Sequence, residues 1–326
     1  MARSHLLEPA PREKLAEVVR DVCGIHAQVM GSAELAISAR VDGITQQDVR
    51  AELWEQRSLV KAWTIRGTLH LHPPDDLPLW AAAVRAVSEP EDAAVLAAIA
   101  DALDGRCLLR EELADEVAKR AGEWTRAKLS SGWGYFIGSA AVEGKLCHGP
   151  PRGNKATFVR TDQWVGWREV DSGEALSESA RRFLTTYGPA GSRQFAEWFG
   201  LRPAKAPQVP EVAVEPGSEP GPLRLLPEYD CYVMGFRERQ QLVPEKVRAR
   251  IKAHPKGRFE GIAAVPTVLA DGLVAGIWRR ARKGKNVEIA VEPARRLDKA
   301  ELEAEAERIG TFLGAEPVLR VGRLDA

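Results

Sequence analysis

The amino-acid sequence predicts an α+β protein in which tandem helix-and-hairpin modules precede a β-rich C-terminal part. Apolar residues recur at helical spacing and are followed by short alternating segments bounded by turn residues. This order, helices and then a hairpin, occurs twice and is typical of winged-helix (helix-turn-helix) domains. Roughly the last hundred residues instead form several alternating segments separated by turn signals such as Asp271-Gly272.

The chain has 326 residues, which is enough for two or three domains with cores of their own. We expect a first winged-helix domain over residues 1–90 and a second over residues 91–172. Residues 173–326 are expected to hold a third group of winged-helix-like helices, a proline-rich linker and the β-rich part with a basic hairpin.

The first module begins with a predicted helix over residues 12–22, which Gly24 ends. In the extended stretch that follows, apolar residues alternate with His26 and Gln28, so both polar side chains should lie on one side. A pattern typical of a capping box starts a later helix at Thr45. The other elements predicted for this module are a helix over 33–40 and two strands over 59–65 and 68–72, joined near Gly67.

The second module repeats this order. Its predicted helices span 108–120, 124–129 and 133–142, and its wing strands span 144–149 and 156–159 around a turn at 150–154. Further helices are expected over 175–187 and 192–199, and the six prolines of residues 203–222 indicate a linker or long loop. The C-terminal part is expected to contain strands over 223–226, 262–269, 273–280 and 287–291, turns at 271–272 and 283–286, and a closing amphipathic helix over 298–313.

The charge balance excludes a protein that is basic over its whole surface. Lys+Arg and Asp+Glu both number 46, so the formal net charge is zero, and only a local patch could support nucleic-acid binding. Residues 245–285 supply one, with eleven basic and three acidic residues. We expect its densest part to contact DNA phosphates from a hairpin tip, the alternative being a solvated turn. The residues concerned are Arg279, Arg280, Arg282, Lys283 and Lys285.

Targeting and cysteine patterns give little sign of a secreted or membrane protein. No segment approaches the roughly 20 apolar residues that a membrane-spanning helix needs, and the N-terminus lacks the apolar core of a signal peptide. The four cysteines are widely spaced and form neither a CxxC pair nor a disulfide pattern. We expect a cytoplasmic monomer with no metal site and no cofactor.

The tripeptide His26-Ala27-Gln28 is the strongest candidate site in the chain. It offers two uncharged hydrogen-bonding side chains, so a reaction here would depend on a positioned water more than on a strong acid. On its own, such a pair is usually two ordinary half-exposed residues. Cys23 also allows a Cys/His nucleophile, although the role of a small buried hydrophobe is the commoner one for cysteine.

Several stretches resemble the AlkZ/YcaQ-like family of bacterial DNA glycosylases, and they occur in order along nearly the whole chain. No single stretch is decisive, but the ordered set is fairly specific. The stretches are Gly24-Ile25-His26-Ala27-Gln28, residues 63–71, Tyr187-Gly188-Pro189-Ala190 with residues 195–198, residues 225–230, and Asp271-Gly272 with residues 276–280.

The resemblance implies a C-shaped array of tandem winged helices that acts on double-stranded DNA and associates with the nucleoid. It implies removal of bulky N7-alkylated purines, including unhooking of interstrand crosslinks, in DNA repair or in self-resistance to genotoxic natural products. The family motif is usually Gln-apolar-Gln, or Gln-apolar-Asp in the YcaQ-like branch. His26 and Gln28 match the His-apolar-Gln variant of actinobacterial relatives, and this departure leaves the substrate range open.

The chemistry expected of such an enzyme suits the motif. Alkylation at N7 gives the purine a positive charge, so the base leaves as a neutral molecule and needs no strong general acid. What remains is to stabilise an oxocarbenium-like sugar and to place a water beneath its anomeric carbon. We assign Gln28 to water positioning, and His26, as a residue with an ordinary pKa of about 6.5, to water activation or oxocarbenium stabilisation.

Other residues in the matching stretches are weaker candidates. Arg66, Thr68 and His70 in the first wing either face the site or organise the wing by hydrogen bonding. Tyr229 and Asp230 either orient His26 or contact DNA, but a role in the fold is favoured for both. The tryptophans expected to pack in cores more than to stack on bases are Trp63, Trp133, Trp198 and Trp278.

Two other classes of function compete with an enzyme on the sequence alone. One is a non-enzymatic winged-helix transcriptional regulator, and the other is a scaffold for protein contacts. A near-neutral chain with one basic hairpin gives little support to sequence-specific promoter binding. No lysine stands out near residues 24–30, which favours a monofunctional glycosylase over one that also cleaves abasic sites.

Overall fold

The computed structural model describes residues 1–131, 135–210, 221–235, 241–253 and 263–324. They form two compact units. The first combines Met1–Val49, Leu184–Ala190 and the described part of Glu211–Ala326, and the second combines Arg50–Phe183 and Gly191–Pro210. The mixture of helices and strands confirms the predicted α+β class. Trp133, residues 211–220 of the proline-rich linker and the start of the strand predicted over 262–269 lie outside the described residues.

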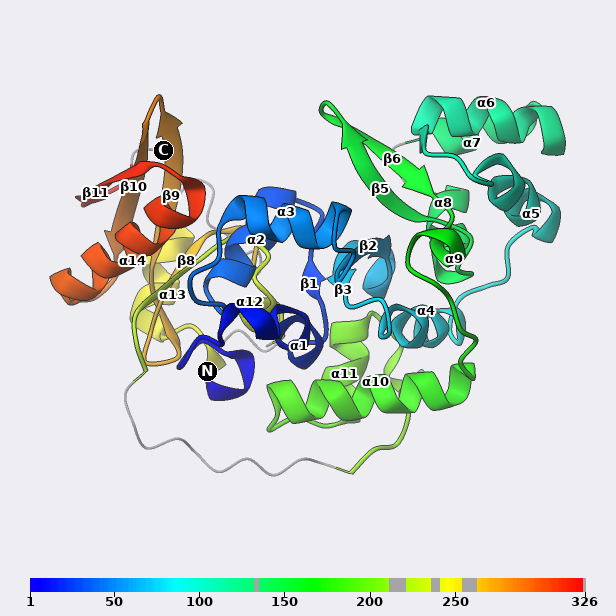
Figure 1. Ribbon diagram of the computed structural model, residues 1–326. Coiled ribbons are helices and arrows are strands. Elements are labelled where there is room, and N and C mark those ends of the chain that lie inside the picture. Colours follow the sequence, from blue (N-terminus) through cyan, green and yellow to red (C-terminus); the bar gives the residue numbers. More distant parts are fainter. Residues whose placement is uncertain (132–134, 211–220, 236–240, 254–262, 325–326) are drawn as a thin grey trace. The chain divides into compact units, whose positions relative to one another are not determined.

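The first unit is organised around a five-stranded sheet with strand order β11-β10-β9-β8-β7 (Figure 1). Neighbouring strands are antiparallel except β10 and β11, which are parallel and are joined by the crossover helix α14. The strands are β7 (Arg224–Leu226), β8 (Thr267–Ala270), β9 (Leu273–Lys283), β10 (Asn286–Pro293) and β11 (Glu316–Val321). The other elements of this unit are α1 (Leu15–Asp21), β1 (Ile25–His26), α2 (Met30–Ser38), α12 (Cys231–Gly235), α13 (Glu245–Ala253) and α14 (Lys299–Leu313).

Local signals in the sequence determine several boundaries of the first unit. The capping box predicted at the start of α3 (Gln46–Trp54) is confirmed, because Thr45 and Asp48 bond each other's backbone amides at 2.9 and 3.2 Å. The turn between β8 and β9 is also confirmed, since Asp271 and Gly272 have the left-handed φ values of 55° and 76°. The sequence pattern does not predict β11, α12 or α13.

The hairpin of β9 and β10 closes through a two-residue turn, as predicted, because Lys283 pairs directly with Asn286. The strand predicted over 273–280 is longer than expected and runs to Lys283. Four of the five basic residues, Arg279, Arg280, Arg282 and Lys283, therefore belong to β9, and Lys285 lies in the turn. Successive residues of a strand point to opposite faces, so the basic run is divided between the two faces of the hairpin.

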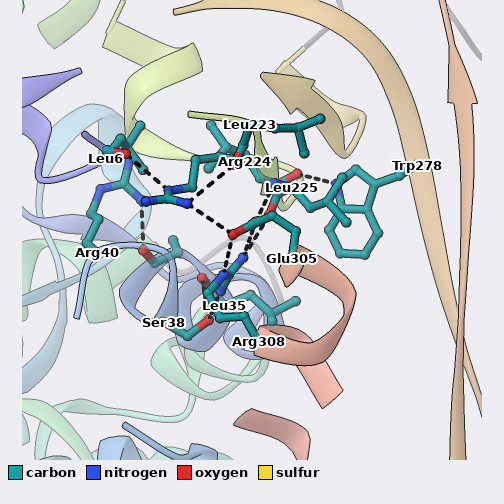
Figure 2. A network of polar contacts seen from close by, with 12 residues as sticks. Leu6, Leu35, Ser38, Arg40, Leu223, Arg224, Leu225, Trp278, Glu305 and Arg308 are labelled. Carbon is teal, nitrogen blue, oxygen red and sulfur yellow. Dashed lines mark hydrogen bonds and ion pairs between the residues drawn. The ribbon is translucent and has the colours of Figure 1, made fainter. Parts of the chain in front are cut away.

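A buried carboxylate connects three elements of the first unit, as Figure 2 shows. Glu305 of α14 accepts hydrogen bonds from the backbone of Leu225 in β7 and from Arg308, both at 2.7 Å. Arg308 in turn donates to the hydroxyl of Ser38 at the end of α2, at 2.9 Å. Burial raises the pKa of Glu305, but Arg308, the backbone N–H of Leu225 and the charge of Arg224 together more than offset this, so the pKa lies below its usual value. The ionised network joins α14, β7 and α2.

The second unit contains the two predicted hairpins. In the first, β2 (Val60–Trp63) pairs with β3 (Leu69–His72). In the second, β5 (Cys147–Arg152) pairs with β6 (Lys155–Val159), and β4 (Leu108–Leu109) pairs with the other edge of β6. The turn predicted over 150–154 is shorter in the structure, because Pro150 and Pro151 stay in β5. They are tolerated there because β5 is an edge strand and its pairing with β6 is irregular between Gly149 and Arg152, so neither proline has a paired position in the ladder.

Besides α3, which crosses from the first unit into the second, eight α-helices of the described chain belong mainly to the second unit. They are α4 (Leu77–Arg85), α5 (Ala93–Ala102), α6 (Arg110–Ala121), α7 (Trp124–Ser130), α8 (Tyr135–Val142), α9 (Thr161–Trp164), α10 (Ser172–Tyr187) and α11 (Ser192–Phe199). The sequence pattern predicts neither α4 nor α5, because both are rich in alanine and show little contrast between two faces. Within the described residues, no helix is long and apolar enough to cross a membrane.

His72 is a buried titratable group in the second unit. Its Nε2 lies 3.0 Å from the hydroxyl of Thr64, and its ring stacks on Trp80 with centroids 5.7 Å apart. Burial lowers the pKa of His72 to about 3, with the Asp76 carboxylate opposing and Arg182 adding to the shift. The imidazole therefore stays neutral in the folded protein at pH values where the unfolded chain binds a proton.

We expect the second unit to lose stability as the pH falls below about 6.5, the ordinary pKa of histidine. The pKa is lower in the folded state, so the stability contributed by neutral His72 is complete above that pH. It then declines by up to about 1.4 kcal/mol per pH unit until the pH approaches the folded value. Urea unfolding of the wild type and of His72→Gln at pH 7.5 and pH 5.0 measures this loss. The variant does not titrate at this position and should lose about 2 kcal/mol less than the wild type; equal losses would contradict the assignment.

Candidate active site

A tight turn precedes the candidate catalytic tripeptide in the first unit. Cys23 and Gly24 have φ values of 62° and 90°, a left-handed backbone that glycine adopts without steric cost. The hydroxyl of Tyr187 donates to the carbonyl of Val22 at 2.9 Å, directly before this turn. Tyr187, which begins one of the stretches that resemble the family, therefore helps to fix the direction in which the chain enters β1.

The structure gives His26 and Gln28 different surroundings. His26 in β1 is 8% exposed, whereas Gln28 is exposed in a bend just before α2. The extended stretch predicted over 25–29 ends at His26, because the carbonyl of Val29 already accepts two hydrogen bonds at 3.1 Å from the first turn of α2. The prediction that both side chains lie on one continuous extended edge is therefore wrong. The two residues are nevertheless separated by one residue only and lie just before α2.

A loop from far along the chain meets this stretch. Between β7 and α12, Glu228 and Tyr229 each contact the segment that runs from β1 into α2. The hydroxyl of Ser32 donates to Glu228 Oε1 at 2.5 Å. The ring of Tyr229 lies beside the imidazole of His26, with centroids 5.1 Å apart and an interplanar angle of 43°. The loop and the tripeptide therefore form one cluster within the first unit.

Asp230, the next residue of the loop, forms a fully buried ion pair with Arg40. The two guanidinium nitrogens lie 2.8 and 2.7 Å from the two carboxylate oxygens, and both side chains are 0% exposed. Burial lowers the pKa of Arg40, but the charge and hydrogen bond of Asp230, with the nearby Cys231 and Tyr187, together raise it by more. The carboxylate also accepts the backbone N–H of Tyr232 at 2.9 Å. These contacts agree with the role in the fold that is favoured for Asp230.

Arg280 approaches the same cluster from β9. Its Nη2 lies 3.2 Å from the position that a Cβ would take on Gly31, in the first turn of α2. Burial lowers the pKa of Arg280, while the charges of Glu228 and Glu34 raise it by less. Arg280 is half-buried, unlike the four exposed basic residues of the hairpin, Arg279, Arg282, Lys283 and Lys285. It thus differs from the other four candidates for phosphate contact.

The exposed basic residues of the hairpin are partly held by neighbouring groups. Arg282 donates to a main-chain carbonyl at the end of α14, at 3.1 Å. Lys283 forms an ion pair with Glu288 at 2.6 Å. The hydrogen bond from Lys283, together with the charges of Arg320 and Arg279, lowers the pKa of Glu288. Three positive charges surround this one carboxylate, so the surface keeps a positive excess.

The three candidates of the first wing lie in the second unit. Arg66 has a left-handed φ of 59° and donates to the carbonyl of Trp198. The hydroxyl of Thr68 donates to Ile65 O at 3.0 Å, and Nδ1 of His70 lies 3.1 Å from the carbonyl of Thr68. These local contacts fit the alternative in which the three side chains organise the wing.

Three of the four tryptophans expected to pack in cores are described, and these three and Cys23 are buried. Trp63, Trp198 and Trp278 are 8%, 4% and 2% exposed, which confirms the prediction that they pack in cores. Trp278 also donates its indole N–H to the carbonyl of Leu226 at 2.7 Å. Cys23 is 1% exposed, as expected of a small buried hydrophobe and not of a reactive thiol.

Reasoning from the sequence missed Glu228, Ser32 and Arg40 as parts of this cluster. The sequence does contain a signal for Glu228, because this residue directly precedes Tyr229 in the short loop between β7 and α12. No local pattern marks Arg40, whose partner is 190 residues away in the chain.

Residues 19–312 match the sequence profile of a family described as DNA glycosylase AlkZ-like. The chain belongs to the AlkZ-like DNA glycosylase family. It is therefore an enzyme, a hydrolase that acts on N-glycosyl bonds. The matched region contains the tripeptide, the loop after β7 and the basic hairpin.

Two comparisons with individual proteins agree with this assignment. The AlkZ-like chain is 28% identical over 317 residues to the "Interstrand DNA cross-link repair glycosylase" of Streptomyces sahachiroi, with 83% of this chain and 84% of the relative aligned. The structure of Streptomyces sahachiroi DNA glycosylase AlkZ matches with a TM-score of 0.78 and 24% identity, over 98% of this chain and 96% of that chain. The structural match establishes a shared fold.

We expect that breaking the Arg40–Asp230 pair from one side strongly destabilises the first unit. Arg40→Met leaves a buried carboxylate without its counterion, and Asp230→Leu leaves a buried guanidinium, so each should lower the free energy of unfolding by about 3–5 kcal/mol. The double variant removes both charges and should recover most of that loss. Urea unfolding of the three variants measures these changes.

The matched control is Arg12→Ala, because Arg12 forms a surface ion pair with Asp48 in the same unit, at 2.7 Å and with side chains 50% and 21% exposed. An exposed pair of this kind typically contributes about 0.2–1 kcal/mol. If a single variant of Arg40 or Asp230 were as stable as Arg12→Ala, the buried pair would not stabilise the first unit as we expect.

Proposed function

We propose that this AlkZ-like enzyme is a monofunctional DNA glycosylase that hydrolyses the N-glycosidic bond of N7-alkylated purines, including bulky adducts and interstrand crosslinks. The observation that carries the proposal is the pair His26 and Gln28 just before α2, where His26 packs against the loop after β7 and Gln28 is exposed. The name of the Streptomyces sahachiroi relative supports crosslinked DNA as a substrate. Such an activity serves DNA repair or self-resistance to a genotoxic natural product.

The proposed chemistry follows from the leaving group. An N7-alkylated purine is cationic and departs as a neutral base, so the site needs a placed water and a weak base. Gln28 is exposed and can hold the water, because its amide both accepts and donates hydrogen bonds. As the water oxygen bonds to the anomeric carbon, His26 accepts the proton that the water gives up. The products are the free purine and an abasic sugar.

The proposed DNA contacts divide the basic hairpin in two. Arg279, Arg282, Lys283 and Lys285 are exposed, and we assign them to the phosphate backbone, which sequence-independent binding requires. Arg280 is half-buried beside Gly31, and we assign it to bracing β9 against α2.

Several finer features belong to the same proposal. We propose that the helix-and-hairpin modules are tandem winged helices in a C-shaped array, with the domain boundaries given above. We also propose that the enzyme works as a cytoplasmic, nucleoid-associated monomer. The two hairpins that follow helices in the second unit support the winged-helix part.

We expect His26→Ala and Gln28→Ala each to slow base release while DNA affinity is kept. Loss of a general base typically costs about 10²- to 10⁴-fold in rate, and neither change removes a phosphate contact. Single-turnover release of free base from duplex DNA carrying N7-methylguanine measures the rate, and fluorescence anisotropy measures the affinity. Wild-type release at the same rate in both variants would contradict the catalytic assignment.

Matched controls for these variants are available in the same unit. His5→Ala changes a histidine that pairs with Asp21 at 2.8 Å, and Gln47→Ala changes an exposed glutamine of α3. Both should release base at the wild-type rate. If the wild type shifts DNA but releases no base from methylated or crosslinked duplexes, the non-enzymatic regulator becomes the better description.

We expect Arg282→Ala and Lys285→Ala to weaken binding to all DNA sequences equally and to flatten its salt dependence. Each phosphate contact contributes about 0.9 to the slope of the logarithm of affinity against the logarithm of salt concentration, so the double variant should lose about 1.8. The control is Lys299→Ala, whose side chain is 84% exposed on α14. If the double variant kept the wild-type slope, the assignment of the hairpin to the DNA-binding surface would be wrong.

A further inference from the structure

The loop after β7 holds the catalytic segment at three successive residues. Glu228 accepts from Ser32 at 2.5 Å, Tyr229 lies against His26 with ring centroids 5.1 Å apart, and Asp230 forms the buried pair with Arg40. The three partners span β1, the first turn of α2 and the residues just after α2. A loop that follows the whole length of this segment can fix the position of each side chain on it.

The backbone of Tyr229 is strained. Its φ is 60°, in the left-handed region that bulky side chains rarely occupy. Its N–H donates to the carbonyl of Ala263 at 2.5 Å, and the buried pair of Asp230 fixes the next residue. Glycine adopts this backbone without cost, so a tyrosine here adds strain in exchange for its ring.

The ring of Tyr229 lies beside a residue whose orientation matters. The imidazole of His26 can rotate about two side-chain bonds, and the Tyr229 ring packs against it at an angle of 43°. His26 is 8% exposed, so its remaining open surface is small. A base that takes a proton from a placed water must be held to within about 0.5 Å of its working position.

We propose that Tyr229 is a positioning residue, which holds the imidazole of His26 toward the attacking water while the loop around it is fixed by Ser32 and Arg40. This inference rests on the proposed function, because it assigns His26 a step in base release. This role differs from a purely structural one. The strained backbone at Tyr229 lowers the stability of the fold, and we infer that the benefit of the tyrosine lies in catalysis.

The decisive variant is Tyr229→Gly, which relieves the backbone strain and removes the ring. We expect single-turnover base release to slow by roughly 10- to 100-fold, the usual effect of misplacing a catalytic group. The melting temperature should stay the same or rise. The pH at which release falls on the acidic side, which reports the protonation of the base, should also move.

Three further variants keep the test decisive. Tyr229→Asn also tolerates a left-handed backbone and removes the ring, so it replaces the glycine variant if that protein does not fold. Tyr229→Phe keeps the ring and should restore release and its pH profile to within about twofold of the wild type. Asp271→Gly makes the same backbone change at φ 55° in the turn between β8 and β9, and it should leave release unchanged.

The outcomes distinguish a failure of this inference from a failure of the proposed function on which it rests. A wild type that releases base, together with Tyr229→Gly and Tyr229→Asn variants of wild-type rate and pH profile, would overturn the role of Tyr229 alone. Slower release with an unmoved pH profile and a lower melting temperature would also overturn it, in favour of a role in the fold. A wild type that releases no base from any alkylated duplex would overturn the proposed function and this inference together.

Discussion

The buried ion pair of Arg40 and Asp230 is the contact on which the candidate active site depends. Removing two charges from water costs several kcal/mol per ion, which only close and well-aligned pairing offsets. The geometry is correspondingly strict, with both oxygens within 2.8 Å of a guanidinium nitrogen. The pair fixes the end of α2 against the loop after β7, and Tyr229, the neighbour of Asp230, then lies beside His26.

The network around Glu305 joins α2 and β7 at a second point. Arg308 connects this carboxylate to Ser38 in α2, and the backbone of Leu225 connects it to β7. The two networks bind α2 and β7 through charges that are matched within the protein. The residues of these two networks are therefore charged, whereas the tripeptide that they support carries two side chains without a fixed charge. This contrast fits the proposed function, in which a cationic base would enter the site without the repulsion that an unpaired arginine or lysine would cause.

The sequence predicts those parts of the fold that short-range patterns specify. The capping box at Thr45, the turn at Asp271-Gly272 and the hairpin of β2 and β3 each depend on a few neighbouring residues, and all are confirmed. The helices α4 and α5 escape prediction because alanine-rich segments show little periodicity. The strand β11 escapes because its pairing with β10 is created by a crossover helix.

The candidate site is predicted only in part for the same physical reason. His26 and Gln28 stand out by their motif, and Tyr229 by the stretch that resembles the family. The partners that hold them come from elsewhere in the chain: Asp230 meets Arg40 across 190 residues, and no pattern within either segment records this. The inward position of Arg280 is hidden in the same way, because charge counting treats all the arginines of the hairpin alike.

The order in which the chain is synthesised gives the Glu305 network a further consequence. A ribosome makes the tripeptide at residues 26–28, but the carboxylate that anchors β7 belongs to residue 305, much later in the chain. Domains form as their residues emerge from the ribosome, N-terminal parts first. The network forms only after residues 305 and 308 have been made, so a nascent or prematurely terminated chain carries the candidate tripeptide without these contacts. The support of the candidate site is thereby linked to the synthesis of α14.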